Sequence, residues 1–140
     1  MPTNEHVVRK FFEGFWNAGG LELAEELMAA DHVHHIADLD VHGPDGVKEL
    51  VTSLLEAFPD LTFVLEDLLM DADKVAVRWT AHGTHTGPLG DLEATGRWAK
   101  WTGIDLIRPR DGQIVELWAS ADAMGLYEQL TATAPSQLGT

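Results

Sequence analysis

One histidine follows an apolar strand pattern at a position where it could take part in chemistry. From Val75 to His85 every second residue is apolar or small, and His85 has the same parity as Trp79. Because side chains alternate across a strand, the imidazole should project from the apolar face. There it could hydrogen-bond a substrate carbonyl or relay a proton near neutral pH. The alternative is a histidine at the rim of the sheet that hydrogen-bonds the following loop.

One carboxylate occupies a comparable position near the end of the chain. Ile114, Trp118 and Asp122 share a parity, so Asp122 should lie on an apolar face at the end of its strand. Apolar neighbours would raise the pKa of such a carboxyl and suit it to general acid–base catalysis. Asp122 also precedes an apolar helical segment, where aspartate is a favoured N-cap. The two roles are compatible.

Four histidines in the segment 31–42 raise the question of a metal site: His32, His34, His35 and His42. The sequence has no cysteine and no helical HExxH pair, so the usual partners of a histidine metal ligand are missing. We therefore expect no metal ion. One histidine directed inward among several solvated ones is the better interpretation, and we assign that position to His35.

Aromatic side chains are numerous and could line a pocket for a flat ligand. The chain has five tryptophans, which are large planes suited to the core or to an aromatic ligand. Asp105 lies in the middle of a predicted strand, either solvated outside, paired with a neighbouring strand, or inside as a protonated hydrogen-bond donor. Arg78 is expected to point outward because its parity is opposite to that of Trp79. The predicted ligand-binding residues are Phe12, Trp16, Trp79, Trp101, Asp105 and Trp118.

The elements that would position these residues form an α+β fold. Apolar periodicity predicts helices at about 7–16, 21–28, 44–58 and 122–130, and strands at about 61–65, 75–86, 98–109 and 113–121. The segment 31–42 is expected to be irregular or a short strand. We predict one domain over 1–140, with 134–140 as a flexible tail. A cone-shaped, curved antiparallel sheet would wrap around helices, the third above all, and enclose a hydrophobic pocket.

Composition narrows the class of partner. The net charge of −14 and the pI near 4.6 disfavour nucleic acid and anionic membrane surfaces. No signal peptide or membrane span is evident, so a cytoplasmic protein is expected. Without a phosphate-binding glycine loop or a nucleophile elbow, we expect cofactor-free acid–base chemistry on a hydrophobic small molecule.

Several sequence segments match one family in order. The chain resembles the SnoaL-like polyketide cyclases of the nuclear-transport-factor-2-like superfamily, whose members have cone-shaped α+β folds. The resemblance covers about residues 5–130. The segments that carry it are FFEGFWNAG at 11–19, VRWTAHGTHTG at 77–87, TGR at 95–97, GID at 103–105, DGQIVELW at 111–118 and DAMGL at 122–126.

The resemblance implies an intramolecular aldol condensation that closes a ring on a polycyclic aromatic polyketide ester. The family's essential carboxylate would be Asp122, its early inward histidine would be His35, and His85 would orient or polarise a carbonyl. A steroid isomerase is disfavoured because Phe12 stands where those relatives have a tyrosine. An epoxide hydrolase is disfavoured because Gly103 stands where an arginine is needed.

Three functions follow as hypotheses. The first is this cyclase-type enzyme, and the second is a non-catalytic module that binds an apolar metabolite. The third is a protein–protein platform on the sheet surface. A homodimer, or a dimer of dimers, is expected under all three, because an apolar outer face of a sheet needs cover.

Overall fold

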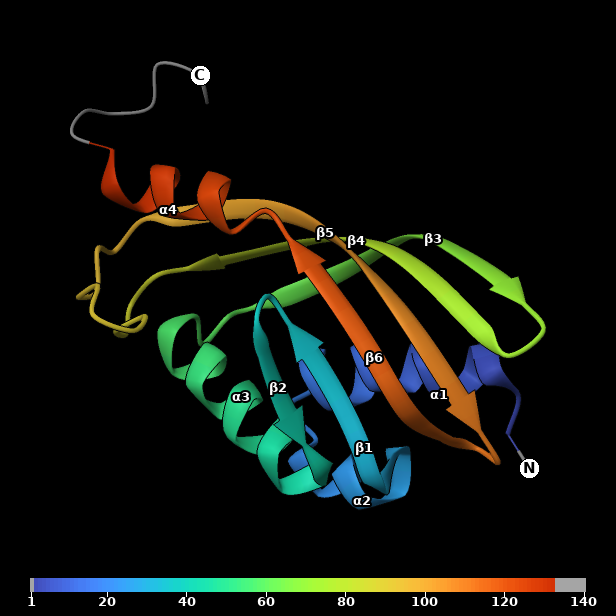
Figure 1. Ribbon diagram of the computed structural model, residues 1–140. Helices are drawn as coiled ribbons and strands as arrows, with labels where there is room; N and C mark the ends of the chain where they lie inside the picture. Colours follow the sequence, from blue (N-terminus) through green and yellow to red (C-terminus); the bar gives the residue numbers. More distant parts are fainter. Residues whose placement is uncertain (1, 133–140) are drawn as a thin grey trace.

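The fold is an α+β arrangement, as predicted, with one curved sheet and helices against it (Figure 1). The computed structural model describes residues 2–132, so the predicted tail at 134–140 lies outside the described residues. The strands are β1 (Met28–Ile36), β2 (Leu39–His42), β3 (Thr62–Asp71), β4 (Lys74–Thr84), β5 (Trp98–Arg110) and β6 (Gln113–Ala121). Their order across the sheet is β2-β1-β6-β5-β4-β3. Within this part of the chain β1 and β6 run parallel, and the other neighbouring pairs run antiparallel.

Short turns join the long strands where the sequence places turn residues. Asp111 and Gly112 between β5 and β6 both have positive φ angles, of 53° and 80°. A two-residue hairpin turn that matches the twist of the strands requires this conformation, which Asp-Gly adopts readily. The predicted turn at 71–74 likewise joins β3 to β4.

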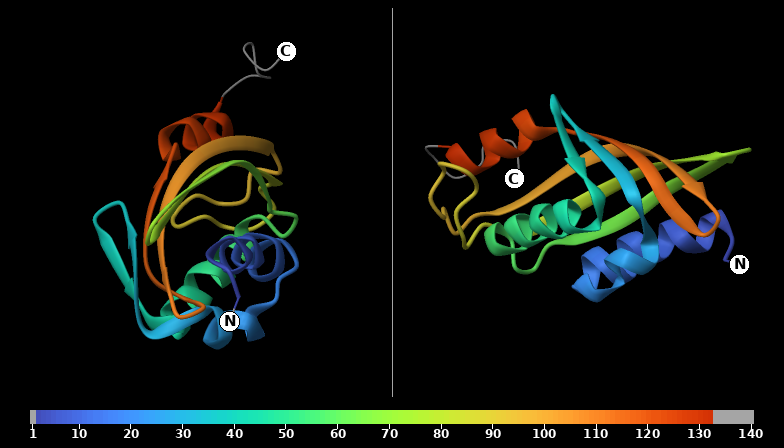
Figure 2. Two further views of the ribbon diagram at one scale, coloured as in Figure 1. Left: turned by 90° about the vertical axis from the view of Figure 1, so that its right-hand side faces the viewer. Right: turned by 60° about the horizontal axis from the view of Figure 1, so that its bottom comes forward.

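The helices divide the two faces of the sheet. They are α1 (Asn4–Lys10), the π-helix η1 (Phe11–Asn17), the 3-10 helix η2 (Leu21–Leu23), α2 (Ala24–Leu27), α3 (Gly43–Ala57) and α4 (Ala123–Thr131). We call the concave face covered by α1, η1 and α3 the inner face, and the opposite one the outer face (Figure 2). The prediction that the sheet wraps mainly around the third helix was incomplete. In the structure α3 packs on β1 and β2, whereas α1 and η1 lie against β3–β6.

The π-helix gathers four large apolar side chains on one side of the first helical segment. The four large side chains of this face, Phe11, Phe12, Phe15 and Trp16, are all buried. A π-helix, with its i→i+5 hydrogen bonds, has more residues per turn than an α-helix. Side chains one and four residues apart therefore span a narrower arc than in an α-helix, and all four can reach the core. Asn17 ends the segment with two hydrogen bonds to the backbone of Phe63, at 2.9 and 2.8 Å. This ties the first helix to β3.

The segment 31–42, expected to be irregular or a short strand, belongs to a hairpin of two strands. β1 extends over nine residues and pairs with both β2 and β6. It carries three of the four histidines of this segment, so an ordered strand fixes which of them point inward. The sequence prediction allowed a short strand but not one of nine residues, because several of its residues are polar for a buried position.

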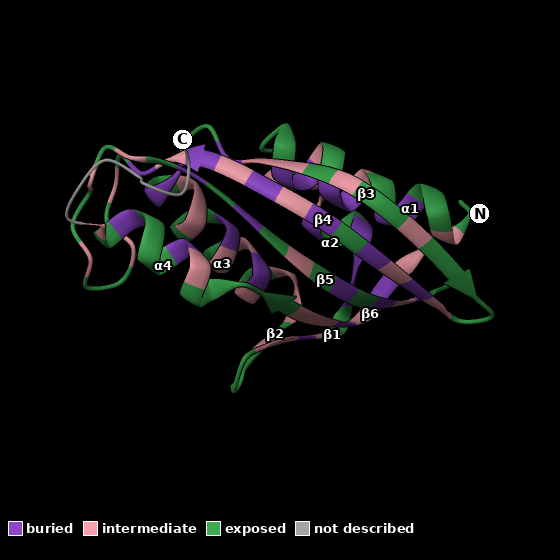
Figure 3. Ribbon diagram, turned by 90° about the horizontal axis from the view of Figure 1, so that it is seen from above, coloured by how far each residue is buried: buried purple, intermediate pink, exposed green. Residues whose placement is uncertain are grey.

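Alternation along the central strands defines the core (Figure 3). In β4, Val75, Val77, Trp79 and Ala81 are buried, as their parity predicts. In β5 the odd-numbered residues from Ala99 to Pro109 are the ones that turn inward, and the even-numbered ones up to Leu106 are exposed. Each long central strand therefore has one face in the core and one face outside.

Candidate active site on the inner face of the sheet

Among residues 2–132 a single carboxylate is buried, in the middle of β5. Asp105 is only 6% exposed, and its Oδ1 accepts a hydrogen bond of 3.0 Å from the indole Nε1 of Trp79. Burial raises the pKa of Asp105 to about 7, and the hydrogen bond from Trp79 opposes this only in part. Of the three positions that the sequence left open for Asp105, the structure selects the interior one.

A glycine makes the contact between Trp79 and Asp105 possible. Gly103 is paired with Trp79 across the β4–β5 ladder. A Cβ atom at position 103 would lie 2.2 Å from Cζ2 of the indole, a distance that no side chain could tolerate. Because Gly103 has no side chain, the indole can lie across the strand and direct its N–H to the carboxyl two residues away.

Aromatic rings gather on the inner face around Trp79, the hydrogen-bond partner of Asp105. Phe63 of β3 contacts Trp79, Trp16 and Phe12, with ring centroids 5.0, 5.0 and 5.5 Å apart. Further along, Trp101 packs on Phe58 at 5.0 Å. Three of the six predicted ligand-binding residues, Phe12, Trp16 and Trp79, thus meet at Phe63 in one aromatic wall, and Asp105 lies beside it through its hydrogen bond with Trp79. Trp101 belongs to a separate contact with Phe58. The rings fill the space between sheet and helices, so a flat ligand would replace ring–ring contacts with ring–ligand contacts.

Two histidines of β1 that were not selected from the sequence are buried in the interior. His32 and His34 are 1% and 3% exposed, and Nε2 of His32 is 3.1 Å from Nδ1 of His34. Burial lowers the pKa of His32 to about 4 and that of His34 to about 3, so both are neutral at physiological pH. His34 pairs with Leu117 of β6 and packs near Phe11, with ring centroids 6.3 Å apart.

His85 is buried at the end of β4, as its parity predicted. Its Nδ1 is 2.9 Å from Oγ1 of Thr95 and accepts a hydrogen bond of 3.2 Å from the backbone N–H of Thr95. Its Nε2 is fully enclosed and has no partner among the described residues, and the ring lies 5.3 Å from that of Phe58. The contact with the following loop that the sequence offered as the alternative is therefore present, and one ring nitrogen stays unused.

His35 does not lie inside, contrary to prediction. It is directed to the outer face, where Nε2 is 2.7 Å from Oε2 of Glu116 and Nδ1 is 2.7 Å from Oδ1 of Asp40. Its ring stacks on Trp118 at 5.3 Å. The hydrogen bonds to Glu116 and Asp40 raise the pKa of His35, and the bond from His35, with help from Arg108, lowers the pKa of Glu116. The inward histidine is its neighbour, because adjacent residues of a strand face opposite ways.

A β-bulge explains why Trp118 also lies outside. Pro109 pairs with Ile114, but the next pair is Arg108 with Glu116, so Val115 is an extra residue in β6. One inserted residue reverses the parity of everything after it, and Trp118 moves from the face of Ile114 to the opposite face. Proline cannot donate a ladder hydrogen bond, so Pro109 is the one sequence signal for this irregularity.

The bulge at Val115 also moves Asp122 to the outer face. It is exposed and caps α4, with Oδ1 accepting a hydrogen bond of 2.9 Å from the backbone N–H of Gly125. Together with Arg78, Ile104 and Trp118 it borders a shallow hollow of about 730 Å³ on the outer face. Asp105 and Asp122 therefore lie on opposite faces of the sheet.

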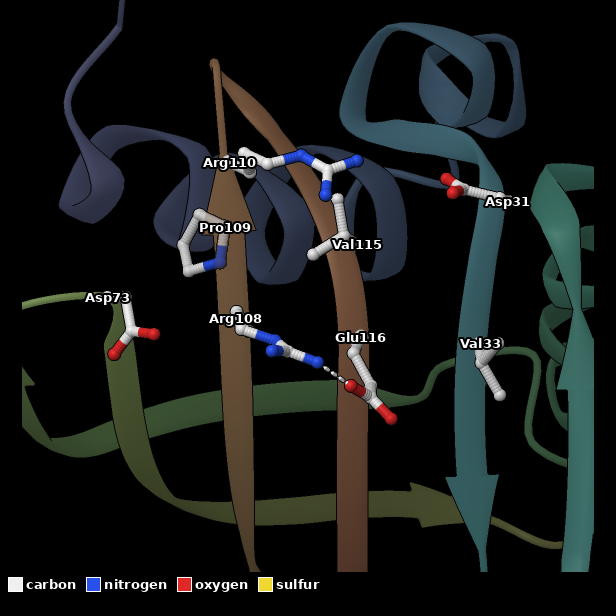
Figure 4. A pocket seen from close by; sticks show the side chains of 8 residues that line it. All are labelled: Asp31, Val33, Asp73, Arg108, Pro109, Arg110, Val115 and Glu116. Atoms are coloured by element: carbon white, nitrogen blue, oxygen red, sulfur yellow. Dashed lines mark hydrogen bonds and ion pairs between the residues drawn. The ribbon is translucent and has the colours of Figure 1, made fainter.

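A second outer hollow, of about 410 Å³, lies where β1, β5 and β6 run side by side (Figure 4). Arg108 is directed at Glu116 and forms an ion pair with it, and its guanidinium also lies over Trp118 at 5.9 Å. The charge of Arg108 is thus already balanced within the protein. The hollow is lined by Asp31, Val33, Asp73, Arg108, Pro109, Arg110, Val115 and Glu116.

Two further properties of the described residues bear on function. Within 2–132 no three histidine, cysteine, aspartate or glutamate side chains are grouped so that they could hold a metal ion. In the same part of the chain, no helix has both the length and the apolar character needed to cross a membrane.

Comparison with known proteins identifies the family. The sequence model of the SnoaL-like polyketide cyclases matches residues 6–130. The chain belongs to this family. None of the curated proteins matches the chain. Three solved structures show how the family shares this fold.

A protein from Jannaschia sp. CCS1, provisionally assigned as a SnoaL-like polyketide cyclase, is 23% identical, with 94% of this chain and 93% of that chain covered and a TM-score of 0.87. IdmH from Streptomyces antibioticus, provisionally a polyketide cyclase, is 31% identical, with 90% and 96% covered and a TM-score of 0.77. AclR from Streptomyces galilaeus, provisionally a hydroxylase, is 28% identical, with 90% and 93% covered and a TM-score of 0.80. One SnoaL-like fold is thus found in proteins assigned to different reactions.

Proposed function

We propose that this SnoaL-like protein is a cofactor-independent enzyme that performs acid–base chemistry on a flat, hydrophobic ketone or ester. The observation that carries the proposal is Asp105, a carboxyl buried beside an aromatic wall, with a pKa of about 7. A group with a pKa near the working pH can both accept and return a proton efficiently. The family membership and the likeness to IdmH support a ring-closing aldol reaction as the chemistry.

The proposed reaction needs only proton transfers and one new carbon–carbon bond. The carboxylate of Asp105 takes the proton from the acidic carbon between two carbonyl groups, which leaves an enolate conjugated with the ring system. The enolate carbon then attacks a ketone carbonyl carbon of the same molecule. The alkoxide that forms receives the proton back from Asp105, so the product keeps every atom of the substrate.

The neighbours of Asp105 have separate parts in this proposal. The N–H of Trp79 holds one carboxyl oxygen and thereby directs the other toward the ligand. The rings of Phe12, Trp16 and Phe63 would stack on the flat substrate. They exclude water, which keeps the carboxyl in the environment that raises its pKa.

Asp105 and Asp122, one on each face of the sheet, offer a direct test. With a polycyclic aromatic β-keto ester as substrate, Asp105→Asn should lower kcat by roughly 10²–10⁴-fold, the usual contribution of a general acid–base. Asp122→Asn, the matched change on the outer face, should keep most of the activity. The catalytic role predicted for Asp122 from family resemblance remains a competing prediction. If Asp122→Asn were inactive and Asp105→Asn active, our assignment would be refuted and Asp122 would be the catalytic carboxylate.

A binding module of the same fold is the second candidate. The contacts among Trp16, Phe63 and Trp79 form an apolar surface that could hold a flat metabolite without changing it. In that case the ligand would bind equally well to wild type and Asp105→Asn. Mass spectrometry of the ligand recovered from wild type would show an unchanged compound.

The outer face supports a homodimer as part of this proposal. Ile104 is 54% exposed and Leu106 37% exposed, side by side on β5 and next to Trp118 of β6. An antiparallel sheet with an apolar outer face is stabilised when a second copy covers it. Light scattering at micromolar concentration should give twice the chain mass, and Ile104→Glu should give the mass of one chain. A monomer mass for the wild type would contradict this part of the proposal.

A further inference from the structure

A chain of hydrogen bonds runs through the two buried histidines of β1. It begins at the backbone carbonyl oxygen of Ile114, which is 3.1 Å from Nδ1 of His32. It continues from Nε2 of His32 to Nδ1 of His34, also 3.1 Å apart. Nε2 of His34 is the free end, since it forms no hydrogen bond within residues 2–132 and is not among the fully enclosed unpartnered atoms.

The polarity of this chain follows from its first atom. A carbonyl oxygen can only accept, so Nδ1 of His32 must carry a hydrogen. A neutral imidazole has a single N–H, which leaves Nε2 of His32 as an acceptor. Nδ1 of His34 must then be the donor to it, and Nε2 of His34 keeps its lone pair. One backbone carbonyl thus determines the tautomers of two side chains.

Burial keeps both rings in the neutral state that this argument needs. His32 and His34 lie in the core, and the charged form of each would lose its hydration there. Three charged groups on the strands that pack here act on His32: His35 and Glu116 are directed to the outer face and pair with each other, and Asp31 is exposed. The ring of Phe11 packs near that of His34, with centroids 6.3 Å apart. A tautomer change at His34 would place the lone pairs of its Nδ1 and of Nε2 of His32 against each other at 3.1 Å.

We propose that His32 is a positioning residue that holds His34 as a fixed hydrogen-bond acceptor, with the lone pair of Nε2 presented to the inner face. The location of a ligand there rests on the proposed function. This acceptor restricts the class of ligand. A flat aromatic compound must offer a phenolic or enolic hydroxyl group to Nε2 of His34. A ligand with only a carbonyl or ether oxygen at that point meets a second acceptor and is rejected.

Two substitutions at one position separate this role from a structural one. His32→Gln supplies an amide oxygen that can accept from Nδ1 of His34, whereas His32→Leu has a similar volume and no acceptor. Both lose the hydrogen bond to the carbonyl of Ile114, so they share any cost in stability. The difference between them reports on the tautomer alone.

The readouts are nitrogen-15 NMR of the His34 ring and the binding of two probes, 1-naphthol and 1-methoxynaphthalene, at pH 7.5. In wild type and His32→Gln, Nδ1 of His34 should be protonated and Nε2 bare, and 1-naphthol should bind about tenfold more tightly than its methyl ether. In His32→Leu both tautomers of His34 should be populated. The ratio of the affinities for 1-naphthol and for its methyl ether should then fall toward one. The preference and the NMR signature are measured without turnover, so they stand or fall independently of the Asp105 assay.

Two results would overturn the inference. One is a wild-type spectrum in which Nε2 of His34 carries the hydrogen. The other is a His32→Leu variant that keeps both the wild-type tautomer and the preference for 1-naphthol. Should His32→Leu fail to fold, the wild-type and His32→Gln spectra and affinities still decide the question.

Discussion

His34 and His35 are neighbours in sequence and opposites in chemistry. His34 faces inward, where burial lowers its pKa to about 3, and its charge is suppressed. His35 faces outward, where hydrogen bonds to Glu116 and Asp40 raise its pKa and favour its charge. Both lie on β1 with nearly the same backbone. The inner and outer faces of one sheet therefore assign different protonation states to the same residue type.

The carboxylates repeat this contrast on the neighbouring strands. Asp105 of the inner face has a raised pKa because it is desolvated, whereas Glu116 of the outer face has a lowered pKa because it binds His35 and Arg108. A buried group that is difficult to ionise is suited to proton transfer, and a solvated ion pair is suited to holding strands together. Proton chemistry should therefore be confined to the inner face.

The largest expected effect is on the pH dependence of stability, through Asp105. An unfolded aspartate ionises near pH 3.8, but the folded one stays protonated up to about pH 7. Between these values the folded state holds the extra proton, so stability falls as pH rises and the loss is complete above pH 7. Asp105→Asn should remove a penalty of at most roughly 4 kcal/mol, from about three pH units at ~1.4 kcal/mol each.

Urea titrations at pH 4, 6 and 8 would measure this effect. The variant should match the wild type near pH 4 and be the more stable protein at pH 8. Asp122→Asn, the same substitution at an exposed carboxylate of the outer face, provides the control for the change itself. A difference between Asp105→Asn and wild type that does not vary with pH would mean that Asp105 is not held in a desolvated site.

The second effect concerns the glycine that admits the indole of Trp79. Gly103→Ala should destabilise the protein by about 1–3 kcal/mol, the usual cost of forcing extra volume into a packed core. It should also displace Nε1 of Trp79 from Asp105. Urea unfolding gives the first quantity, and the pH at which Asp105 titrates, followed by NMR of its carboxyl carbon, gives the second. An unchanged titration would show that the indole does not depend on Gly103.

A smaller effect is expected from the outer carboxylate at the start of α4. Asp122→Ala removes a helix cap and should cost about 1 kcal/mol, within the usual range for an N-cap aspartate. The free energy of unfolding from urea titration measures it. A gain in stability would contradict the capping role. It would indicate that the carboxylate of Asp122 destabilises the folded state, as is typical of a functional group, and the contrast between the inner and outer faces would be weaker.

The smallest effect is that of His35. Its folded pKa is raised, so its ion pairs stabilise the protein fully below the unfolded value near pH 6.5 and are lost as pH rises through the folded pKa. Because the pairs with Asp40 and Glu116 are partly solvated, His35→Gln should cost less than about 1 kcal/mol at pH 5.5. The cost should vanish at pH 9. A cost that is larger at pH 9 would reverse the sign and exclude the ion pairs as its cause.

The success of the sequence prediction depended on how regular each strand is. The alternation from Val75 to His85 is unbroken, and both the burial of His85 and the outward position of Arg78 were predicted from it. β5 alternates just as strictly, but exposed apolar residues such as Ile104 concealed the pattern and left Asp105 unresolved. A search for strict period-two positions, whatever their polarity, would have placed Asp105 inside.

The wrong assignments of side chains to the inner face have a common cause: they depend on how a strand pairs with its neighbours. Trp118 and Asp122 were assigned to the inner face because nothing in their own strand reveals that Val115 is an extra residue. The irregularity arises where β6 meets Pro109 of β5, so it is a property of the pair. His35 was chosen over His34 because β1 gains its strand structure from pairing with β2 and β6.

The sequence by itself determined the α+β class, the turns, the long helix that begins at Gly43 and the family resemblance, since these follow from local conformation and periodicity. Only the tertiary structure decided which face each ionisable side chain occupies. Pairing between strands distant in sequence sets register and bulges, and a shift of one residue moves a side chain from water into the core. The chemistry of Asp105, His34 and His35 is set by that placement, because burial and partners determine the charge of each group.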